Sequence, residues 1–451
     1  MKSLTGIDAA FLYMETPETP MHVAGLHIYE PPADFSGSFF EHFKEFFQSR
    51  MHLAPIFEKK LARTVLELHH PGWVDADELD WNYHLRHINV PTPGTWEQLE
   101  RMVGDLHSIP LDRSKPLWQI DIIEGLESGN IAVYSKMHHA AIDGGAGMAI
   151  AAALFDMSPK PRAVKPPPPK PAKKRKPTME ERAILGIADV IQSVAKQQLK
   201  AMEALPQFLG TVHDMLAPKK SEGGAGSGSG LPGIPDVLAP KTPFNVTITG
   251  KRSFAARDLS LTDVKAIGKA TGAKVNDVVM AVCAGALRTY LADHKKLPKK
   301  PLVAFVPISL RAPGDADASN QVFGMLCPIA TQLADPLERL AAIRKESGSS
   351  KTLAGTVKDV APKDYTVLGA PILFPGLAQL YGASRLADVM PSTTNLTISN
   401  VMGPPFPLFC AGAKILALYP VSIPVHGIAL NITVQSYQDK LNMGITADRK
   451  A

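Results

Sequence analysis

The sequence predicts a mixed α/β protein that folds in two parts. Stretches with the helical spacing of apolar residues are interleaved with short stretches of strand character along both halves of the chain. Two tracts that cannot build a hydrophobic core, 161–177 and 223–230, separate these halves. The length of 451 residues suits more than one domain. We therefore expect a first domain over 1–158, a linker over 159–241 and a second domain over 242–451.

The first part is expected to combine three strands with three helices. Phe39, Phe43 and Phe46 recur at the spacing that places them on one face of a helix. The helix after residue 143 is rich in alanine and glycine, so its backbone can approach its neighbours closely. The expected strands are 21–29, 117–123 and 131–138, and the expected helices are 36–50, 95–107 and 144–155.

The second part repeats this theme, although no repeat relates the two halves at the level of sequence. Helices are expected at 261–270, 275–293 and 336–347. Strands are expected at 302–309, 395–400, 415–419, 428–437 and 440–445. Each part thus holds strands for a sheet and helices to flank it.

The region between the two parts combines three kinds of segment. The Pro/Lys-rich tract 161–177 predicts an extended, solvated linker, and the Gly/Ser tract 223–230 predicts a flexible spacer. Between them, 181–216 has apolar residues near helical spacing, with a break or kink at Pro206. A basic tract before an amphipathic helix is typical of an anchor at a membrane surface. Packing of this helix across both domains is an equally weighted alternative.

The net charge of +5 is concentrated in one place. Residues 160–179 hold eight lysines and arginines and no acidic residue, so the remainder of the chain is net negative. This tract has no interleaved aromatic residues, and we therefore expect no nucleic-acid partner.

Cysteine usage and hydropathy favour a cytoplasmic protein, with a peripheral position at a membrane or at lipid inclusions as the alternative location. Cys283, Cys327 and Cys410 are odd in number and widely spaced, which is typical of reduced thiols. No apolar run reaches the ~18 residues that span a bilayer. The first twenty residues include Asp8 and Glu15 and lack a continuous apolar run, so no secretory signal is expected.

The most informative stretch of the chain runs from His138 to Gly144. Two adjacent histidines end an apolar run, and an Asp-Gly-Gly turn and a small-residue helix follow. Neighbouring side chains of a strand point to opposite faces, so only one of the two imidazoles is expected to enter a site. We predict that this is His139, which stands nearer the turn. Asp143 is expected to fix the turn through an ion pair, with Arg311 as its partner.

An imidazole at this place predicts general-base chemistry. Histidine titrates near pH ~6.5, so it can take a proton from an alcohol or thiol and return it to a leaving group. No Gly-x-Ser-x-Gly element and no cysteine in an activating context is present, which favours direct attack by the substrate without a covalent intermediate. A buried structural histidine pair is the alternative, although the pair His69-His70, followed by Pro71, lacks the Asp-Gly spacing. A metal site is disfavoured because no second ligand-spaced histidine follows.

Several further motifs extend this one. The sequence is similar to the CoA-dependent acyltransferase superfamily through His138-His139-x-x-x-Asp143-Gly144, and it resembles in particular the bacterial wax ester synthase/acyl-CoA:diacylglycerol acyltransferases. The residues that carry the closer resemblance are Asp8, Phe11, Leu12, Pro20-Met21-His22, Pro116-Leu117-Trp118, Asn276-Asp277-Val278-Val279, 307–311, 320–321, 399–404 and 430–433. The resemblance covers nearly the whole chain except 160–235. One departure is Ser319, where the family usually has glycine.

The resemblance implies a two-domain fold like that of chloramphenicol acetyltransferase, with a mixed sheet flanked by helices in each domain and an active-site tunnel between them. It implies transfer of a long-chain acyl group from acyl-CoA to a fatty alcohol, giving a wax ester, or to diacylglycerol, giving triacylglycerol, without a metal or prosthetic group. A membrane or lipid-droplet surface is a further possible partner. A condensation-type enzyme acting on carrier-protein-bound acyl groups and a non-enzymatic lipid-binding protein remain alternatives.

The resemblance also implies roles for individual residues. His139 is expected to be the general base, next to His138, with Asp143 and Gly144 supporting the turn. Asn276 is the candidate for a donor to the oxyanion or for orienting it, and capping of a helix that begins near Val278 is its alternative role. The remaining motif residues are expected to be structural, and these are Pro116, Leu117, Trp118, Asp277 and Arg311.

Overall fold

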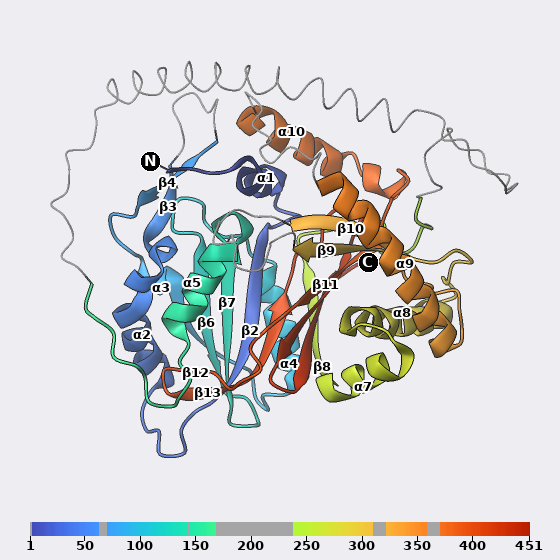
Figure 1. The fold of residues 1–451 in the computed structure, drawn as a ribbon. Helices are drawn as coiled ribbons and strands as arrows, with labels where there is room; N and C mark the ends of the chain where they lie inside the picture. The colour runs from blue at the N-terminus through green and yellow to red at the C-terminus, as the bar shows by residue number, and fades with distance from the viewer. Residues whose placement is uncertain (1, 63–69, 143, 168–237, 310–321, 359–369) are drawn as a thin grey trace, which may run out of the picture.

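The computed structural model describes residues 2–62, 70–142, 144–167, 238–309, 322–358 and 370–451 (Figure 1). Asp143, Arg311 and residues 320–321 lie outside the described residues. The same holds for the helix expected at 181–216 and for the spacer expected at 223–230.

Two six-stranded mixed sheets form the body of the molecule. The first has the order β12-β13-β2-β7-β6-β5 and the second the order β10-β9-β11-β14-β15-β8, while a small third sheet has the order β1-β4-β3. The first sheet consists of β12 (Phe409–Cys410), β13 (Ala413–Val421), β2 (His22–Glu30), β7 (Ile131–His138), β6 (Trp118–Glu124) and β5 (Leu85–Asn89). The second consists of β10 (Val322–Pro328), β9 (Val303–Ser309), β11 (Leu396–Val401), β14 (Leu430–Tyr437), β15 (Lys440–Asp448) and β8 (Arg252–Ser260). The third consists of β1 (Lys2–Ser3), β4 (Gly72–Asp75) and β3 (Lys59–Ala62).

Helices flank these sheets (Figure 1). They are α1 (Gly6–Met14), α2 (Phe39–Arg50), α3 (Trp81–His84), α4 (Trp96–His107), α5 (Gly144–Leu154), α7 (Leu261–Thr271), α8 (Val275–Asp293), α9 (Pro336–Lys358) and α10 (Ala370–Ala383). The strand predicted at 131–138 and the helix predicted at 275–293 have the predicted bounds, whereas α9 runs eleven residues beyond its predicted end. The sequence patterns did not predict the helices α1, α3 and α10 or the strands β1, β3, β4, β5, β8, β10 and β12.

The two halves of the chain share a sheet. β13 belongs to the part expected as the second domain, yet it pairs antiparallel with β2, with Leu418 opposite His27. The halves also meet where α4 crosses β8, because a Cβ atom on Gly104 would lie 2.8 Å from the carbonyl oxygen of Arg252. A side chain there would collide with the backbone, so glycine permits this approach. The division of the chain at the linker stays a prediction. The first sheet includes two strands, β12 and β13, that follow the linker in the sequence.

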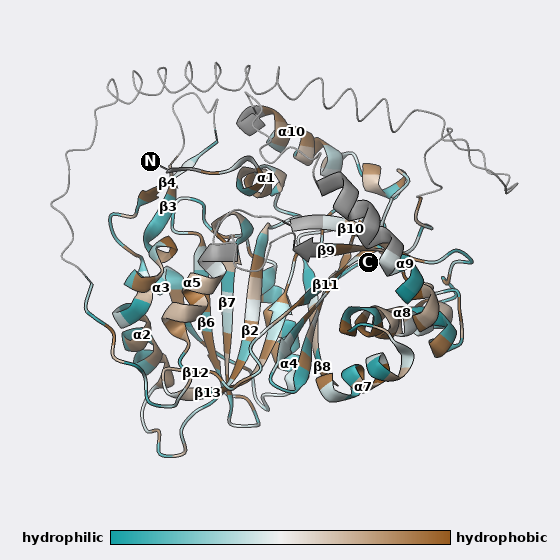
Figure 2. Ribbon diagram, viewed as in Figure 1, coloured by the Kyte–Doolittle hydropathy of each residue, from teal (hydrophilic) through white to brown (hydrophobic). Residues whose placement is uncertain are grey.

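Hydrophobic residues line the strands of both sheets (Figure 2). Phe43, Phe47 and Trp118 lie in the core of the first sheet, and Val279 and Ile398 lie in that of the second. Among the described residues, α8 is the one helix long and apolar enough to cross a membrane by length and composition alone. Its buried face packs into the core of the second sheet. All three cysteines are buried, and none of them forms a disulfide.

The beginning of the basic tract is held against the fold, which corrects the expectation of a solvated segment from residue 161. Arg162 Nη1 donates to the carboxylate of Asp156 and to the carbonyl of Phe155, each at 2.7 Å. The guanidinium of Arg50 donates to the carbonyl of Arg162 at 2.9 Å. The last turn of α5 leaves carbonyl groups without helical partners, and these arginines satisfy them. The tract is therefore anchored before it leaves the described residues.

Candidate active site

The two histidines of the motif lie where β7 ends. His138 is the last residue of the strand, and His139 begins a short 3-10 turn that runs to Ala141. The premise that both side chains belong to one strand was therefore wrong. The backbone turns immediately after His138, because the amide of Ala140 donates to Nδ1 of His138 at 3.1 Å. This local bond ends the extended conformation.

Burial distinguishes the two imidazoles. The side chain of His138 is 0% exposed, whereas His139 retains partial exposure. The amide of His138 donates to the carbonyl of Leu117 at 3.0 Å, and the amide of His139 donates to the carbonyl of Met21 at 2.8 Å. Hydrogen bonds thus hold the backbone of both histidines between Leu117, which precedes β6, and Met21, which precedes β2.

The ring of His139 is covered on one face by Phe11 of α1. The two ring centroids lie 3.8 Å apart and the planes differ by 14°. Burial lowers the pKa of His139 to about 4; its own backbone carbonyl acts in the opposite direction, and the charge of His138 adds to the lowering. Nδ1 of His139 is buried, and no other described residue lies at hydrogen-bond geometry to it. At neutral pH the ring therefore carries a free lone pair.

His138 is held by a carboxylate that the sequence analysis did not predict. Nε2 of His138 lies 3.1 Å from Oε2 of Glu15, the residue that follows the last turn of α1. This contact has the distance but not the angle of a good hydrogen bond. Since Nδ1 of His138 accepts from an amide, the ring proton is assigned to Nε2, on the side of the carboxylate.

Glu15 is itself buried and paired. Its side chain is 8% exposed, Oε1 accepts from Nε of Arg113 at 2.9 Å, and Oε2 accepts from the amide of Met21 at 2.8 Å. Burial alone would raise the pKa of Glu15, but the contact with His138, the charges of His138 and Arg113 and the Met21 amide together lower it. Glu15 is consequently ionised at neutral pH.

The Pro116-Leu117-Trp118 element lies in the core of the first sheet. Trp118 is 1% exposed, and its Nε1 donates to the carbonyl of Phe57 at 2.9 Å. Its ring also stacks on His84, with centroids 4.2 Å apart. Pro116 and Leu117 are buried beside it, and the carbonyl of Leu117 supports His138.

Asn276 and Asp277 lie in the first turn of α8, which begins at Val275. The carboxylate of Asp277 accepts from the backbone amide of Lys274 at 2.9 Å and from the hydroxyl of Ser347 at 2.7 Å. Asp277 therefore performs the capping that was the alternative role of Asn276. Asn276 is partly exposed, and no hydrogen bond joins its side chain to any other described residue.

Gly144 is the first residue of α5, as the motif predicts. The other end of this helix is fixed by a buried ion pair between Arg50 and Asp156, in which Nη1 and Oδ2 lie 2.8 Å apart. The predicted pair of Asp143 with Arg311 involves two residues that lie outside the described ranges. In the described part of the chain, no three His, Cys, Asp or Glu side chains cluster as they would around a metal ion.

Phe11, Glu15 and Arg113 are the site residues that sequence reasoning missed. Phe11 and Met21 belong to elements that were quoted only for their resemblance to a family. Glu15 carries no local signal, because its partners Arg113 and His138 lie far away in the sequence. Only the docking of α1 against the end of β7 reveals them.

Two mixed sheets with a paired-histidine motif at a strand end define the class of CoA-dependent acyltransferases. The chain belongs to the wax ester synthase/diacylglycerol acyltransferase family within that class. The family model for the wax ester synthase/diacylglycerol acyltransferase catalytic domain matches residues 4–279, and the model for the C-terminal domain of the same family matches residues 318–451. The chain is therefore an acyltransferase.

Individual relatives agree with this assignment. An O-acyltransferase of Acinetobacter baylyi is 36% identical over 455 residues, which cover 100% of this chain and 93% of that protein. A Mycobacterium tuberculosis protein named as a putative diacylglycerol O-acyltransferase is 35% identical, with 99% of this chain and 95% of that protein covered.

Solved structures show the same fold. The wax ester synthase/diacylglycerol acyltransferase of Marinobacter aquaeolei matches with a TM-score of 0.68 at 30% identity, covering 100% of this chain and 94% of that one. A starter condensation domain of rhizomide synthetase, solved with C8-CoA, matches with a TM-score of 0.50 at 13% identity. The match covers 99% of this chain and 89% of the condensation domain. At 13% identity, this similarity shows a shared fold and nothing further.

Proposed function

We propose that this enzyme transfers a long-chain acyl group from acyl-CoA to the hydroxyl of a fatty alcohol or of diacylglycerol, with His139 as general base. The observation that carries the proposal is an imidazole that is partly exposed yet kept neutral by its surroundings. A neutral ring at physiological pH can accept the proton of an alcohol. The names of the relatives support both acceptors.

The reaction proceeds in two proton transfers. Nδ1 of His139 is the buried nitrogen, so Nε2 faces the substrate and takes the proton of the acceptor hydroxyl. The alcohol oxygen attacks the thioester carbonyl carbon, and a tetrahedral oxyanion forms. Its collapse breaks the carbon–sulfur bond, and the imidazolium returns the proton to the CoA sulfur. The ester and free CoA are the products, and the imidazole is regenerated.

Two further features of the site are proposed to support catalysis: a hydrogen-bond donor to the oxyanion and the turn that follows His139. Asn276 is the proposed donor, supported by a side chain that is partly exposed and not engaged with other described residues. Asp143 and Gly144 are proposed to support the turn after His139, with Arg311 as the partner of Asp143. We further propose that both substrates reach His139 through a tunnel between the two halves.

Direct attack is favoured over a covalent acyl-cysteine. Burial raises the pKa of both Cys283 and Cys410 to about 12, and Cys327 is also fully buried. A thiol that stays protonated is a poor nucleophile.

The decisive variant is His139→Ala, assayed by release of free thiol from acyl-CoA in the presence of hexadecanol or diacylglycerol. General-base catalysis contributes about 10²–10⁴-fold, so a loss of that size is expected. His294→Ala, at an exposed histidine that follows α8, is the matched control. An unchanged rate for His139→Ala would contradict the proposal.

Two alternatives are separated by the same assay. A condensation-type enzyme would prefer acyl groups on a carrier protein to free acyl-CoA, whereas we expect turnover with free acyl-CoA. A non-enzymatic lipid-binding protein would bind the acyl-CoA without releasing thiol from it.

We also propose that the enzyme meets its acceptors at a phospholipid-coated neutral-lipid surface. α10 presents four large apolar side chains that are 41–62% exposed, namely Leu373, Phe374, Leu377 and Leu380. None of the residues of this helix is charged, which suits an uncharged lipid phase. α10 contacts α1, the helix that covers His139 (Figure 1).

Flotation with triacylglycerol droplets coated with phosphatidylcholine tests this surface. The double variant Leu377→Ser/Leu380→Ser is expected to reduce the bound fraction severalfold. Leu337→Ser, at a 64% exposed leucine on α9, is the control. Equal binding by the double variant and the wild type would contradict the proposed surface.

A further inference from the structure

We propose that Glu15 is a positioning residue for acyl transfer, holding His138 and the backbone at His139 in the arrangement that the reaction needs. This inference rests on the proposed role of His139 as the base. Glu15 acts through other groups, because its contacts are with His138, Met21 and Arg113.

The first contact orients His138. The backbone amide of Ala140 occupies Nδ1 of this ring, and the carboxylate of Glu15 faces Nε2 at 3.1 Å. A negative charge beside Nε2 favours the tautomer whose proton is on that nitrogen. That tautomer leaves Nδ1 free to accept from Ala140, which fixes the turn in which His139 lies. Hydrogen-bond partners of this kind commonly determine imidazole tautomers.

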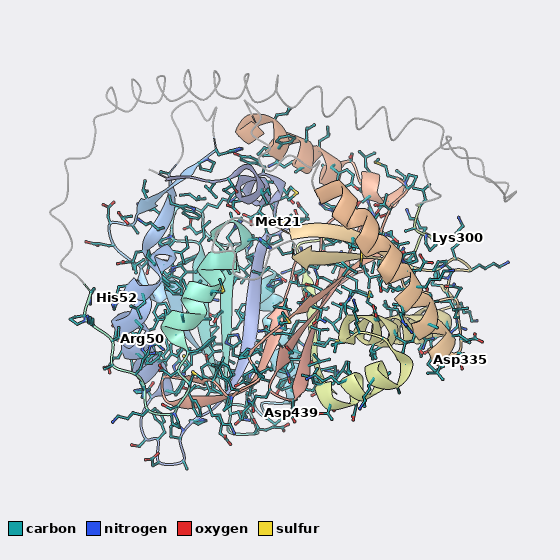
Figure 3. The ribbon with its side chains drawn as sticks, viewed as in Figure 1. Met21, Arg50, His52, Lys300, Asp335 and Asp439 are labelled. Carbon is teal, nitrogen blue, oxygen red and sulfur yellow. The ribbon has the colours of Figure 1, made fainter. Side chains whose placement is uncertain are left out.

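The second contact reaches His139 through a single residue, Met21. Oε2 of Glu15 accepts from the amide of Met21 at 2.8 Å, and the carbonyl of Met21 accepts from the amide of His139 at 2.8 Å. Figure 3 places Met21 beside α1 at the start of β2. The two bonds together fix the backbone of Met21, so the carboxylate holds in place the carbonyl that accepts from the amide of His139.

The third contribution comes from the helix that carries Glu15. Phe11 and Glu15 are four residues apart, the spacing that aligns side chains on one helix face. From that face Phe11 stacks on His139 while Glu15 reaches His138. Nη2 of Arg113 donates to the carbonyl of Leu12 at 2.7 Å while its Nε donates to Glu15. Arg113 therefore ties the end of α1 to the carboxylate.

Steady-state kinetics of Glu15→Gln and Glu15→Ala test the proposal. A displacement of ~1 Å in a catalytic group can cost about 10²-fold, so kcat of the alanine variant is expected to fall by roughly that factor. KM for acyl-CoA is expected to change by less than about threefold, since Glu15 contributes orientation and not binding. Glutamine keeps one carbonyl oxygen for Met21 and His138, so Glu15→Gln is expected to retain more activity than Glu15→Ala.

The control variant is Glu41→Gln on α2, where the carboxylate is 61% exposed and, within the described part of the chain, is paired with Lys44. Far-UV circular dichroism and the melting temperature of each variant separate positioning from unfolding. If Glu15→Ala does not fold, Glu15→Gln carries the test. Wild-type kcat in both variants would overturn the proposal, and so would a loss of activity that only follows the loss of folded protein.

A spectroscopic readout is independent of activity. In protein with ¹⁵N-labelled histidine, long-range ¹H–¹⁵N correlations report the tautomer of each ring. We expect the Nε2–H tautomer for His138 in the wild type and a mixture in Glu15→Ala. A wild-type His138 protonated at Nδ1 would overturn the proposal. A fully active His139→Ala variant would instead contradict the proposal that His139 is the general base. The two proposals can therefore be rejected separately.

Discussion

The aromatic ring of Phe11 lies parallel to the imidazole of His139, with 3.8 Å between the ring centroids. One face of His139 is thereby closed to water, which fits the lowering of its pKa to about 4 by burial. α1 therefore supplies both the surroundings of one histidine and, through Glu15, the partner of the other.

Phe11→Ala is expected to change the pH dependence of the reaction. Removing the ring admits water to the imidazole and raises the pKa of His139 from about 4 toward its ordinary value of 6.5. Since the protonated ring cannot act as a base, the acid limb of the kcat/KM profile moves to higher pH. We also expect kcat to fall by roughly tenfold as the ring loses its orientation.

A matched control exists at a second stacked pair. Phe40→Ala removes the ring that stacks on His87, with centroids 5.2 Å apart, and neither residue belongs to the histidine motif. Its pH profile should match that of the wild type. If the acid limb of the kcat/KM profile does not shift in Phe11→Ala, Phe11 does not exclude water from the imidazole of His139.

Buried neutral histidines predict a loss of stability in acid. Burial lowers the pKa of His27 to about 4 and that of His107 to about 3, and it lowers that of His22 well below 6.5. Below pH 6.5 the unfolded chain binds protons at these positions and the folded protein does not, so stability falls as the pH drops toward 4.

Thermal unfolding between pH 7 and pH 4.5 checks this dependence. The melting temperature is expected to fall continuously over that interval, and His27→Leu is expected to reduce the slope. A melting temperature that is constant over the interval would be incompatible with neutral buried rings.

The ion pair at the end of α5 predicts that replacing Arg50 lowers the free energy of unfolding more than replacing Arg162. Arg50 is 2% exposed beside Asp156, which is 4% exposed, so Arg50→Met leaves a buried carboxylate without its buried partner. Removing one partner of a buried pair costs about 3–5 kcal/mol. Arg162 is 41% exposed, and its replacement by Met is expected to cost less than about 1 kcal/mol. Urea unfolding of both variants measures the difference, and equal losses would contradict it.

Trp118→Phe separates structural from catalytic roles in the Pro116-Leu117-Trp118 element. The variant removes the donor to the carbonyl of Phe57 and leaves that group unsatisfied, at a cost of about 1–3 kcal/mol. Activity per folded molecule is expected to stay near the wild-type value. A stable variant with a large loss of kcat would instead place Trp118 at the substrate.

Local pattern was sufficient for most of the elements and for the position of the motif. The apolar run that ends at His138 predicted β7 with its observed bounds, and the spacing over 275–293 did the same for α8. Such patterns depend on residues within a few positions of one another, which is the range over which helix and strand periodicity is expressed. The short α1 and the strand β8 were missed because their apolar periodicity is weak.

The sequence by itself determined the kinds of elements, the paired histidines at a strand end and the family that these motifs indicate. Tertiary structure alone decided that β13 completes the first sheet, that His139 begins a turn outside its strand, and that Glu15 and Phe11 meet the two imidazoles. The reason is physical. These relationships arise when surfaces that are distant along the chain bury each other, and no local spacing of residue types encodes which surfaces will meet.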